Sequence, residues 1–542
     1  MTASRRRLAA ILLALPPLLV PLQNPDIFWH LSAGRWMAQN RAFPRLETFS
    51  FTFAGARWED FEWLTQLLYY GMFSLLGMPG LWLLKVLLMA ACAWISLRVV
   101  RLYGAGEPWE AAAAVAWTAG ALTHSDARPD LMSVLGLSVL LWMLERRRVG
   151  AAAWGAWENA AVFTLFAVWS NCHAGFAFGL ALLASYCLGA LSANPGDGGK
   201  PGQLAGALAA AVAGTLCNPY GVGPYAVMLQ HWGARAELAR HIQEWQPISF
   251  RNGFHWPLWP ILALGFALLL KLRRSRRLPL GLCAATLYFA YNAMRHARLA
   301  SYLNVAVVPL IVCLARESGW LERPAAKRVL TVVGVVYAGY LAWVMAMTPW
   351  SGAFVGRYVP RGAAAFMAQE KDALAPLRVA NPWEWGGYLG FVLPGHRVFS
   401  DGRYIFHPLL AATAEAAADA GKYQDLLARY GATAALARNT GARFASRKLY
   451  PGGATKVFLR PWYLASLPRE RWALVYWDEQ ALLFVDRKAV PSRWLEEHDY
   501  RYVRPGDDAA FREAVALKEI PAERVRVEEE RHRIELLRYR PR

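Results

Sequence analysis

Residues 79–97 read PGLWLLKVLLMAACAWISL, and residues 62–77, just before them, read EWLTQLLYYGMFSLLG. Both runs are almost wholly apolar. A helix rises about 1.5 Å per residue, so the run 79–97 is long enough to cross the roughly 30 Å hydrocarbon core of a bilayer. Whether the run 62–77 also crosses decides on which side of the membrane every later residue lies.

Similar apolar runs recur along the first two thirds of the chain. Together with an N-terminal run at 8–22, behind Arg5-Arg6-Arg7, they predict about eleven membrane-spanning helices. The run 8–22 lacks the small-x-small pattern of a cleaved signal peptide, so we expect it to be retained with the N-terminus in the cytoplasm. The later predicted spans are 110–123, 130–145, 157–171, 174–190, 204–217, 257–271, 278–292, 299–315 and 327–347.

Composition divides the chain in two. Of the 542 residues, 56% are hydrophobic and 18% are charged, which is more apolar surface than a soluble protein of this length can bury. The apolar runs end near Thr348-Pro349, and charges recur every few residues after Trp350. We therefore expect an all-α multi-pass membrane domain at 1–349 and a soluble domain at 350–542.

Basic clusters set the expected orientation. If 62–77 were a span, Arg98, Arg146–Arg148 and the basic residues at 271–277 would all lie outside, against the positive-inside rule. If 62–77 instead lies along the outer membrane surface, in a first outer loop at 23–78, these clusters become cytoplasmic. The last span then exits outward. The prediction is a bacterial cytoplasmic (inner) membrane protein whose C-terminal domain lies in the periplasm or outside the cell.

The formal net charge of +20 does not indicate a nucleic-acid partner. In a membrane protein, Lys and Arg collect in cytoplasmic loops and at lipid headgroups, and the sequence has no basic motif with interleaved aromatic residues. The six cysteines lie within or beside apolar runs, so no disulfide framework or zinc spacing can be drawn.

The first outer loop offers acids among aromatic residues at a membrane boundary. It opens with Asp26-Ile27-Phe28-Trp29-His30 and later contains Glu59 and Asp60. A low dielectric disfavours a charged carboxylate and brings its pKa towards the range of a general base. Asp26 and His30 are four residues apart, so both would lie on one helix face. The alternatives are a helix cap for Asp26 and interfacial packing for His30.

Arginines lie near the outer ends of two predicted spans. Arg128 is flanked by Asp126 and Asp130, and Arg295 and Arg298 precede the span 299–315. Guanidinium groups at this level suit a phosphate or a pyrophosphate. The alternatives are that Arg128 pairs with its neighbouring aspartates and that the other two arginines reach ordinary lipid phosphates.

Further polar residues on the outer side could line a cavity between helices. Asn171, His173, Asn218 and Tyr220 directly follow apolar runs, and Glu244 lies in a later outer loop. Their hydrogen-bonding groups would suit a polyhydroxylated ligand. Caps and turns explain them equally, as Asn-Pro-Tyr-Gly from Asn218 suggests.

The C-terminal domain alternates short strand-like and helical segments, which predicts an α/β or α+β fold. Asp401-Gly402-Arg403 closes a predicted strand at 397–403, a position where polar side chains often reach a ligand. A turn with a local Asp–Arg pair is the alternative. No Gly-rich phosphate loop, nucleophile elbow or metal-spacing motif occurs here. The other strand-like segments are 378–381, 385–389, 432–437, 473–477 and 481–486.

This order of features resembles the GT-C superfamily of integral membrane glycosyltransferases, which includes protein mannosyltransferases, aminoarabinose lipid A transferases and oligosaccharyltransferase catalytic subunits. The carriers in the membrane domain are the short first span, the loop opening at Asp26–His30, the run 62–77 and Arg128-Pro129-Asp130-Leu131. The segments Trp169–Gly175, Cys217–Gly221, Trp385–Leu389 and Ser400–Arg403 resemble a bacterial branch of the superfamily with a similar outer domain.

The resemblance implies a sugar donor carried on a polyprenyl phosphate or pyrophosphate and an inverting transfer to a lipid, glycan or protein acceptor. In the superfamily an acid of the first outer loop activates the acceptor, and Asp26 matches that acid by position. Many members carry two adjacent acids there, whereas Ile27 follows Asp26. Glu59 and Asp60 are therefore candidates for a second acid, and a divalent cation stays open as a cofactor.

A different class of function fits the same composition. The chain could be a transporter of lipid-linked sugars or a non-catalytic membrane scaffold with a GT-C-like fold. Charges near the middle of a span would favour transport, and Lys85 is the one clear case in the sequence.

Overall fold

The computed structural model describes residues 14, 16–122, 125–192, 194–198, 200–273, 275, 277–350 and 352–539. Arg5-Arg6-Arg7 and residues 8–13 and 15 of the predicted span 8–22 lie outside these residues. The chain divides into two units. The first, which we call the helical unit, comprises the residues up to Gln23, Met37–Phe43 and Glu59–Val355. The second, which we call the mixed unit, comprises Asn24–Trp36, Pro44–Trp58 and the residues from Gly356 onward.

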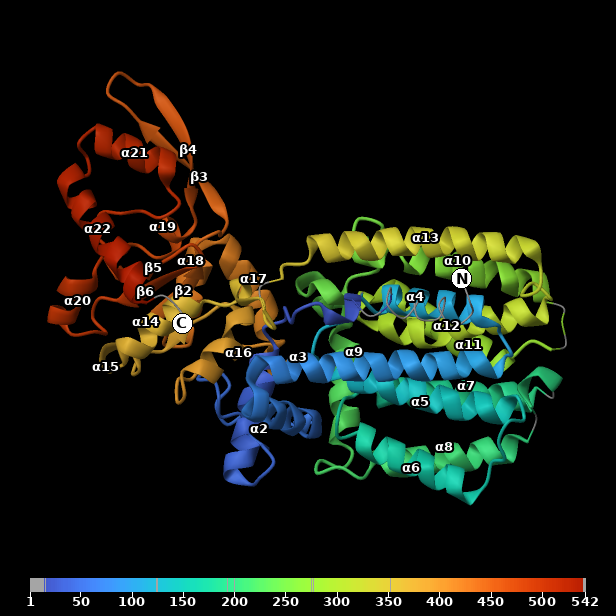
Figure 1. Ribbon diagram of the computed structural model, residues 1–542. Helices are drawn as coiled ribbons and strands as arrows, with labels where there is room; N and C mark the ends of the chain where they lie inside the picture. Colours follow the sequence, from blue (N-terminus) through green and yellow to red (C-terminus); the bar gives the residue numbers. More distant parts are fainter. Residues whose placement is uncertain are drawn as a thin grey trace. The chain divides into compact units, whose positions relative to one another are not determined.

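The long helices of the helical unit run side by side (Figure 1). Every predicted span from 79–97 onward falls on one of them, so the prediction of a helix at each of these places is confirmed. The helix α9 lies between two predicted spans and was not predicted. The helices are α3 (Trp63–Leu102), α4 (Glu107–Ala121), α5 (Asp130–Arg148), α6 (Ala156–Trp169), α7 (Phe176–Leu191), α8 (Pro201–Thr215), α9 (Gly223–His241), α10 (Leu258–Leu272), α11 (Leu280–Arg295), α12 (Ala300–Glu317) and α13 (Pro324–Met347).

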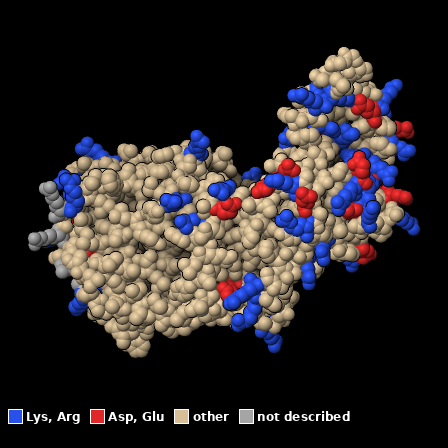
Figure 2. Space-filling model, turned by 180° about the vertical axis from the view of Figure 1, so that it is seen from behind, with Lys and Arg blue, Asp and Glu red and all other residues tan. Residues whose placement is uncertain are grey.

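Among the described residues, four helical segments are long and apolar enough to cross a membrane: Trp63–Leu102, Gly253–Leu272, Ala297–Glu317 and Pro324–Met347. The chain is a membrane protein on this ground, while the number of about eleven spans stays a prediction. The helix α12 is buried among α4, α5, α10 and α11, whereas α13 leaves most of its apolar surface exposed, as a lipid-facing helix does. Charged side chains are sparse over the helical unit and dense over the mixed unit (Figure 2).

The helix α3 is broken at Gly77. This residue has φ 63° and ψ −151°, far from helical values, and Pro79 follows it. A Cβ built on Gly80 would lie 2.5 Å from the carbonyl oxygen of Met72, although residues eight apart in a straight helix are about 12 Å apart along the axis. The chain therefore turns sharply between 63–76 and 78–102. That these two parts differ in direction agrees with the prediction for 62–77, and its place on a membrane surface stays a prediction.

Basic residues gather where three helices end. The guanidinium of Arg148, at the end of α5, donates to Glu145, and the hydroxyl of Tyr103, directly after α3, donates to the same carboxylate at 2.7 Å. Arg316, at the end of α12, donates to the carbonyl oxygen of Tyr103. The basic ends of α3, α5 and α12 thus lie together, and that they face the cytoplasm stays a prediction.

Lys85 is buried inside the helical unit, and its ammonium group donates to the carbonyl oxygen of Val20. One turn earlier on α3, the indole N–H of Trp82 donates to the carbonyl oxygen of Leu19 at 2.9 Å. Next along the chain, Leu22 forms a parallel bridge with Phe354. Lys85 is the one clear charge in the sequence that would favour transport. In the structure it binds the backbone of the segment before the first outer loop.

The mixed unit is built around a four-stranded sheet in the order β1-β2-β6-β5, in which β1 and β2 are parallel and the other pairs antiparallel. This is an α+β arrangement, one of the two alternatives predicted. The strands are β1 (Val379–Ala380), β2 (Ala434–Arg438), β5 (Trp472–Trp477) and β6 (Ala481–Asp486), with a separate hairpin of β3 (Arg443–Leu449) and β4 (Thr455–Pro461). The helices are α2 (Ile27–Asn40), α14 (Arg361–Gln369), α15 (Lys371–Leu374), α16 (Trp383–Val392), α17 (Leu409–Ala418), α18 (Ala420–Arg429), α19 (Tyr463–Ser466), α20 (Ser492–His498), α21 (Asp508–Ala516) and α22 (Ala522–Arg538); the last few residues of α2 fall in the helical unit.

Two strand predictions in the mixed unit are wrong and four are confirmed. The segments 378–381, 432–437, 473–477 and 481–486 fall on β1, β2, β5 and β6, whereas 385–389 lies within the helix α16. The segment 397–403 has one isolated bridge, between Val398 and Ser50, in place of a strand. The hairpin of β3 and β4 was not predicted. The bridge between Val398 and Ser50 also shows that part of the predicted first outer loop, Pro44–Trp58, packs with C-terminal residues.

Candidate functional site

Six charged or titratable residues of the helical unit form a group that we call the polar cluster: Glu62, Arg128, Asp130, His173, Glu244 and Arg298. Each lies at or beside the end of a helix. Glu62 directly precedes α3, Asp130 is the first residue of α5, and Arg128 lies two residues before it. His173 lies between α6 and α7. Glu244 lies in the short helix η4 (Gln243–Trp245), and Arg298 lies in η6 (Ala297–Leu299).

Two arginines of the cluster share one carboxylate. Arg128 and Arg298 both form ion pairs with Glu244, the second with 3.3 Å between Nη1 and Oε1. The side chains keep 16% (Arg128), 26% (Arg298) and 25% (Glu244) of their surface exposed, so an ionic ligand can reach them. The guanidinium of Arg298 also lies over the ring of Trp245, 5.0 Å from its centroid. The structure thus brings together three predicted site residues from three loops.

Glu62 is the carboxyl of the polar cluster whose protonation burial changes most clearly. Burial raises the pKa of Glu62 well above its ordinary value, and the nearby charges of Asp60 and Asp130 raise it further. Arg298 and Arg128 oppose this rise. A carboxyl with a raised pKa keeps its proton to a higher pH than an ordinary carboxyl, which is a property that acid–base chemistry uses.

His173 is held in a defined orientation. Its Nδ1 accepts a hydrogen bond from the backbone N–H of Gly175 at 3.0 Å and lies 2.8 Å from the hydroxyl of Ser133. A backbone N–H can only donate, so the ring proton of neutral His173 is on Nε2. That nitrogen lies 3.8 Å from Oε1 of Glu62, beyond direct hydrogen-bonding distance. The ring of His173 therefore turns the N–H group of Nε2 towards the carboxyl of Glu62.

Ser133 fixes this histidine because its own hydroxyl is fixed. The indole N–H of Trp169 donates to Oγ of Ser133 at 2.8 Å, which leaves the serine proton for Nδ1 of His173. Gly175 must be a glycine here, because a Cβ would lie 2.2 Å from Oγ of Ser133. The chain of hydrogen bonds runs from α6 through α5 to His173.

Asp60 and Glu59, predicted as further acids, lie just before Glu62 in the helical unit and are buried. Asp60 accepts a hydrogen bond from the fully buried side chain of Gln66 at 2.7 Å. Glu59 packs against Gly223 at the start of α9, where a Cβ would lie 2.7 Å from its carboxyl carbon.

The other predicted residues of the helical unit lie in structural contacts. Asn171 donates to the carbonyl oxygens of Ala167 and Cys217 at 2.7 Å each and accepts from the indole of Trp63 at 2.6 Å. Asn218 closes the turn in which Tyr220 lies, accepting from the Tyr220 N–H at 2.8 Å. Arg295 is exposed over the ring of Tyr291. Their predicted contacts with substrate stay predictions.

Asp26 and His30 belong to the mixed unit. The carbonyl oxygen of Asp26 accepts from the N–H groups of Trp29 at 3.1 Å and His30 at 3.4 Å, which places Asp26 at the N-cap of α2. A Cβ built on Gly402 would lie 2.4 Å from Oδ1 of Asp26. His30 is buried, and its ring lies 3.6 Å from that of Trp29.

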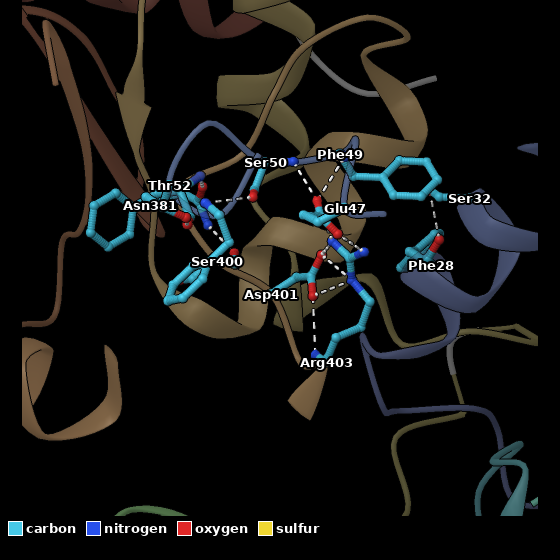
Figure 3. A network of polar contacts seen from close by, with 12 residues as sticks. Phe28, Ser32, Glu47, Phe49, Ser50, Thr52, Asn381, Ser400, Asp401 and Arg403 are labelled. Atoms are coloured by element: carbon cyan, nitrogen blue, oxygen red, sulfur yellow. Dashed lines mark hydrogen bonds and ion pairs between the residues drawn. The ribbon is translucent and has the colours of Figure 1, made fainter. Parts of the chain in front are cut away.

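Asp401 and Arg403 form a buried ion triad with Glu47 (Figure 3). The guanidinium of Arg403 donates to both oxygens of Asp401, at 2.7–3.0 Å, and to both oxygens of Glu47. The two acids raise the pKa of Arg403 above its ordinary value, although burial alone would lower it. Trp58 faces the same guanidinium, with its ring centroid 4.6 Å away.

Sequence reasoning missed Glu62, Ser133 and Glu47 as members of these groups. Glu62 is the first residue of an apolar run in the sequence. It could have been identified, because an acid at such a position needs a polar partner. Ser133 and Glu47 gave no signal, since each acts through a partner far along the chain. No group of three or more His, Cys, Asp or Glu side chains within the described part of the chain has the arrangement of a metal site.

No protein-family model and no curated protein matches the chain in sequence. Solved structures do match it in fold. The oligosaccharyltransferase of Archaeoglobus fulgidus, tethered to an acceptor peptide with an NVT sequon, superposes with a TM-score of 0.57 at 11% identity, covering 85% of this chain and 74% of that one. The same archaeon's oligosaccharyltransferase AglB, in complex with an inhibitory peptide and a dolichol-phosphate, gives 0.54 at 11% identity over the same shares.

ArnT from Cupriavidus metallidurans in the apo state gives a TM-score of 0.49 at 15% identity, covering 90% of this chain and 98% of that one. At these identities the likeness concerns the fold. The oligosaccharyltransferase matches confirm the resemblance drawn from the sequence: the chain has the fold of the GT-C superfamily of integral membrane glycosyltransferases.

Proposed function

We propose that this protein is a membrane glycosyltransferase that moves a sugar from a polyprenyl-phosphate-type lipid donor to an acceptor on the outer face of a bacterial cytoplasmic membrane. The observation that carries the proposal is the meeting of Arg128 and Arg298 at one exposed carboxylate, beside Glu62 with its raised pKa, in a chain with the GT-C fold. AglB of the same fold is described with a dolichol-phosphate, which supports a lipid phosphate as the ligand.

In the proposed reaction Asp26 takes the proton of an acceptor hydroxyl as the hydroxyl oxygen attacks the anomeric carbon. The bond between that carbon and the phosphate oxygen breaks, and its electron pair leaves with the lipid phosphate. The configuration at the anomeric carbon inverts. Arg128 and Arg298 stabilise the charge that develops on the phosphate, which makes a separate general acid unnecessary.

The remaining predicted residues have roles in this proposal. Glu59 and Asp60 are candidates for a second acid, and a divalent cation stays open as a cofactor. His173 and His30 orient donor or acceptor by hydrogen bonds, and Asn171, Asn218, Tyr220 and Arg295 contribute further contacts.

Asp26→Asn tests the proposal in membranes supplied with a polyprenyl-linked sugar. Loss of the general base is expected to lower transfer by about 10²–10⁴-fold. Asp425→Asn is the matched control, because Asp425 is an exposed acid of the same unit. Unchanged transfer by Asp26→Asn would remove Asp26 from the mechanism. Failure of the unaltered protein to consume any such donor would favour the scaffold or transporter.

A further inference from the structure

We propose that Arg403, together with Glu47 and Asp401, is a positioning residue: it fixes the backbone at Gly402 as a wall against the carboxylate of Asp26. The inference deepens the proposed function and rests on the role given there to Asp26. Arg403 and Asp401 then act on the reaction through geometry, in place of the substrate contacts predicted from the sequence.

The triad is closed to solvent. The side chains of Arg403, Glu47 and Asp401 keep 2%, 0% and 3% of their surface exposed. All four carboxylate oxygens accept from the guanidinium, and the rings of Phe49, Trp58 and Phe406 lie around it. A substrate would have to open this enclosure before it reached any of the three side chains.

The triad holds the residues on both sides of Gly402. Asp401 precedes Gly402 and Arg403 follows it, and Oδ1 of Asp401 also accepts the backbone N–H of Arg403 at 3.0 Å. Glu47 is fixed in turn, because its Oε1 accepts the N–H groups of Phe49 at 2.7 Å and Ser50 at 2.6 Å. The turn at Gly402 is therefore anchored to the loop that contains Glu47.

A second set of hydrogen bonds fixes the chain just before the turn (Figure 3). The side chain of Asn381 accepts from the N–H of Phe399 at 2.8 Å and donates to the carbonyl oxygen of Ser400 at 2.9 Å. The hydroxyl of Thr52 donates to the carbonyl oxygen of Phe399 at 2.6 Å. Residues 399–403 are thus held by side chains from two other segments of the chain, although they form no regular strand.

Gly402 brings this fixed backbone into contact with Asp26. A Cβ at position 402 would lie 2.4 Å from Oδ1 of Asp26 and 3.1 Å from the indole nitrogen of Trp29. Gly402 is not among the residues with positive φ, so its conformation alone would accept alanine. The glycine is required by the closeness of the carboxylate. Asp26 caps the N-terminus of α2 with its backbone carbonyl, and the wall limits the directions in which its carboxylate can turn.

A buried ion triad of this kind is a poor device for stability, because two carboxylates and one guanidinium are removed from water. Its value lies in geometry: the planar guanidinium fork defines the direction of each carboxylate.

Gly402→Ala is the first test. The added methyl group meets the carboxylate of Asp26 and no backbone atom, so the fold can absorb it by turning the carboxylate aside. A displacement of this size is expected to lower kcat by about 10²-fold, with the KM for a polyprenyl-linked sugar changed by less than about threefold. Gly390→Ala is the matched control, because there a Cβ meets only Cγ1 of Val398, at an ordinary 3.7 Å.

The decisive readout is a double-mutant cycle with Asp26→Asn. If the wall acts through Asp26, Gly402→Ala lowers transfer in the unaltered protein and adds nothing in the Asp26→Asn background. A merely structural contribution would cost the same factor in both backgrounds. Arg403→Lys keeps the positive charge but removes the planar guanidinium. We expect it, like Gly402→Ala, to lower transfer in the unaltered protein and to add nothing in the Asp26→Asn background. Arg460→Lys is its control, since Arg460 makes a similar fork to Asp507 elsewhere in the unit.

The outcomes separate this inference from the proposed function. If Asp26→Asn transfers normally, the role of Asp26 fails and the wall has no function in catalysis. If Asp26→Asn is impaired but Gly402→Ala is harmless, or additive with it, only the wall is overturned. Should Arg403→Lys fail to fold, Gly402→Ala still decides, because it leaves the triad intact.

Discussion

The protein holds two ionic groups built from the same residue types and exposed very differently. In the polar cluster, Arg128, Arg298 and Glu244 keep 16–26% of their side-chain surface exposed. In the triad, Arg403, Glu47 and Asp401 keep at most 3%. Ion pairs that touch water can exchange one partner for a ligand, whereas sealed pairs cannot without unfolding their surroundings. The first group is suited to binding and the second to holding a shape.

The largest expected effect comes from removing the cation of the buried triad. Arg403→Ala leaves two carboxylates buried without their cation, which is expected to lower the free energy of unfolding of the mixed unit by about 3–5 kcal/mol. Thermal unfolding or limited proteolysis in membranes measures it. Arg471→Ala is the control, because the side chain of Arg471 is 49% exposed in its pair with Asp486. Equal stability of the two variants would show that the triad is not sealed.

The next largest effect concerns an arginine of the polar cluster. Arg128→Gln is expected to weaken binding of a polyprenyl phosphate about 10-fold, the equivalent of roughly 1.4 kcal/mol, and to leave the unfolding temperature nearly unchanged. Lipid binding to the purified protein measures the loss. Arg240→Gln, at an exposed residue of α9 paired with Glu237, is the control. If Arg128→Gln lowered the unfolding temperature and left lipid binding unchanged, Arg128 would have a structural role like that of Arg403 and not a role in binding.

The smallest effect depends on pH. The pKa of Glu62 is raised in the folded protein, so the folded state loses stability as Glu62 ionises, from its ordinary value of 4.5 upward. Glu62→Gln removes this loss. The variant is expected to unfold a few degrees higher than the unaltered protein at about pH 8 and at the same temperature near pH 4.5. Glu322→Gln, at an exposed acid, should shift both temperatures alike. A pH-independent difference for Glu62→Gln would contradict the raised pKa.

The helices of the helical unit were predictable because a helix that faces lipid is apolar on every side. Val332, Val335 and Val336 of α13 are all exposed, a pattern that no soluble helix would keep. The segment 397–403 was not predictable, because its extended shape comes from the side chains of Asn381 and Thr52 and not from a strand ladder. Local sequence cannot report a contact whose partner lies elsewhere.

The same limit applies to the site. Guanidinium groups at span ends pointed to Arg128 and Arg298, and the structure brings these two together. That Glu244 joins them depends on a loop that the sequence leaves unplaced, 116 residues beyond Arg128. Glu62 was missed because its pKa is raised first by burial and then by the nearby charge of Asp60, and the burial arises only in the folded chain.

Glu47 and Arg403 are 356 residues apart. A ribosome adding roughly 5–20 residues per second makes the arginine about 20–70 s after the glutamate. During that interval the loop that contains Glu47 is already synthesised, but Arg403, which pairs with Glu47 in the folded protein, has not yet been made. The segment Pro44–Trp58 must therefore wait in an unfinished state while the intervening helices are made, and a residue translated much later completes its interior.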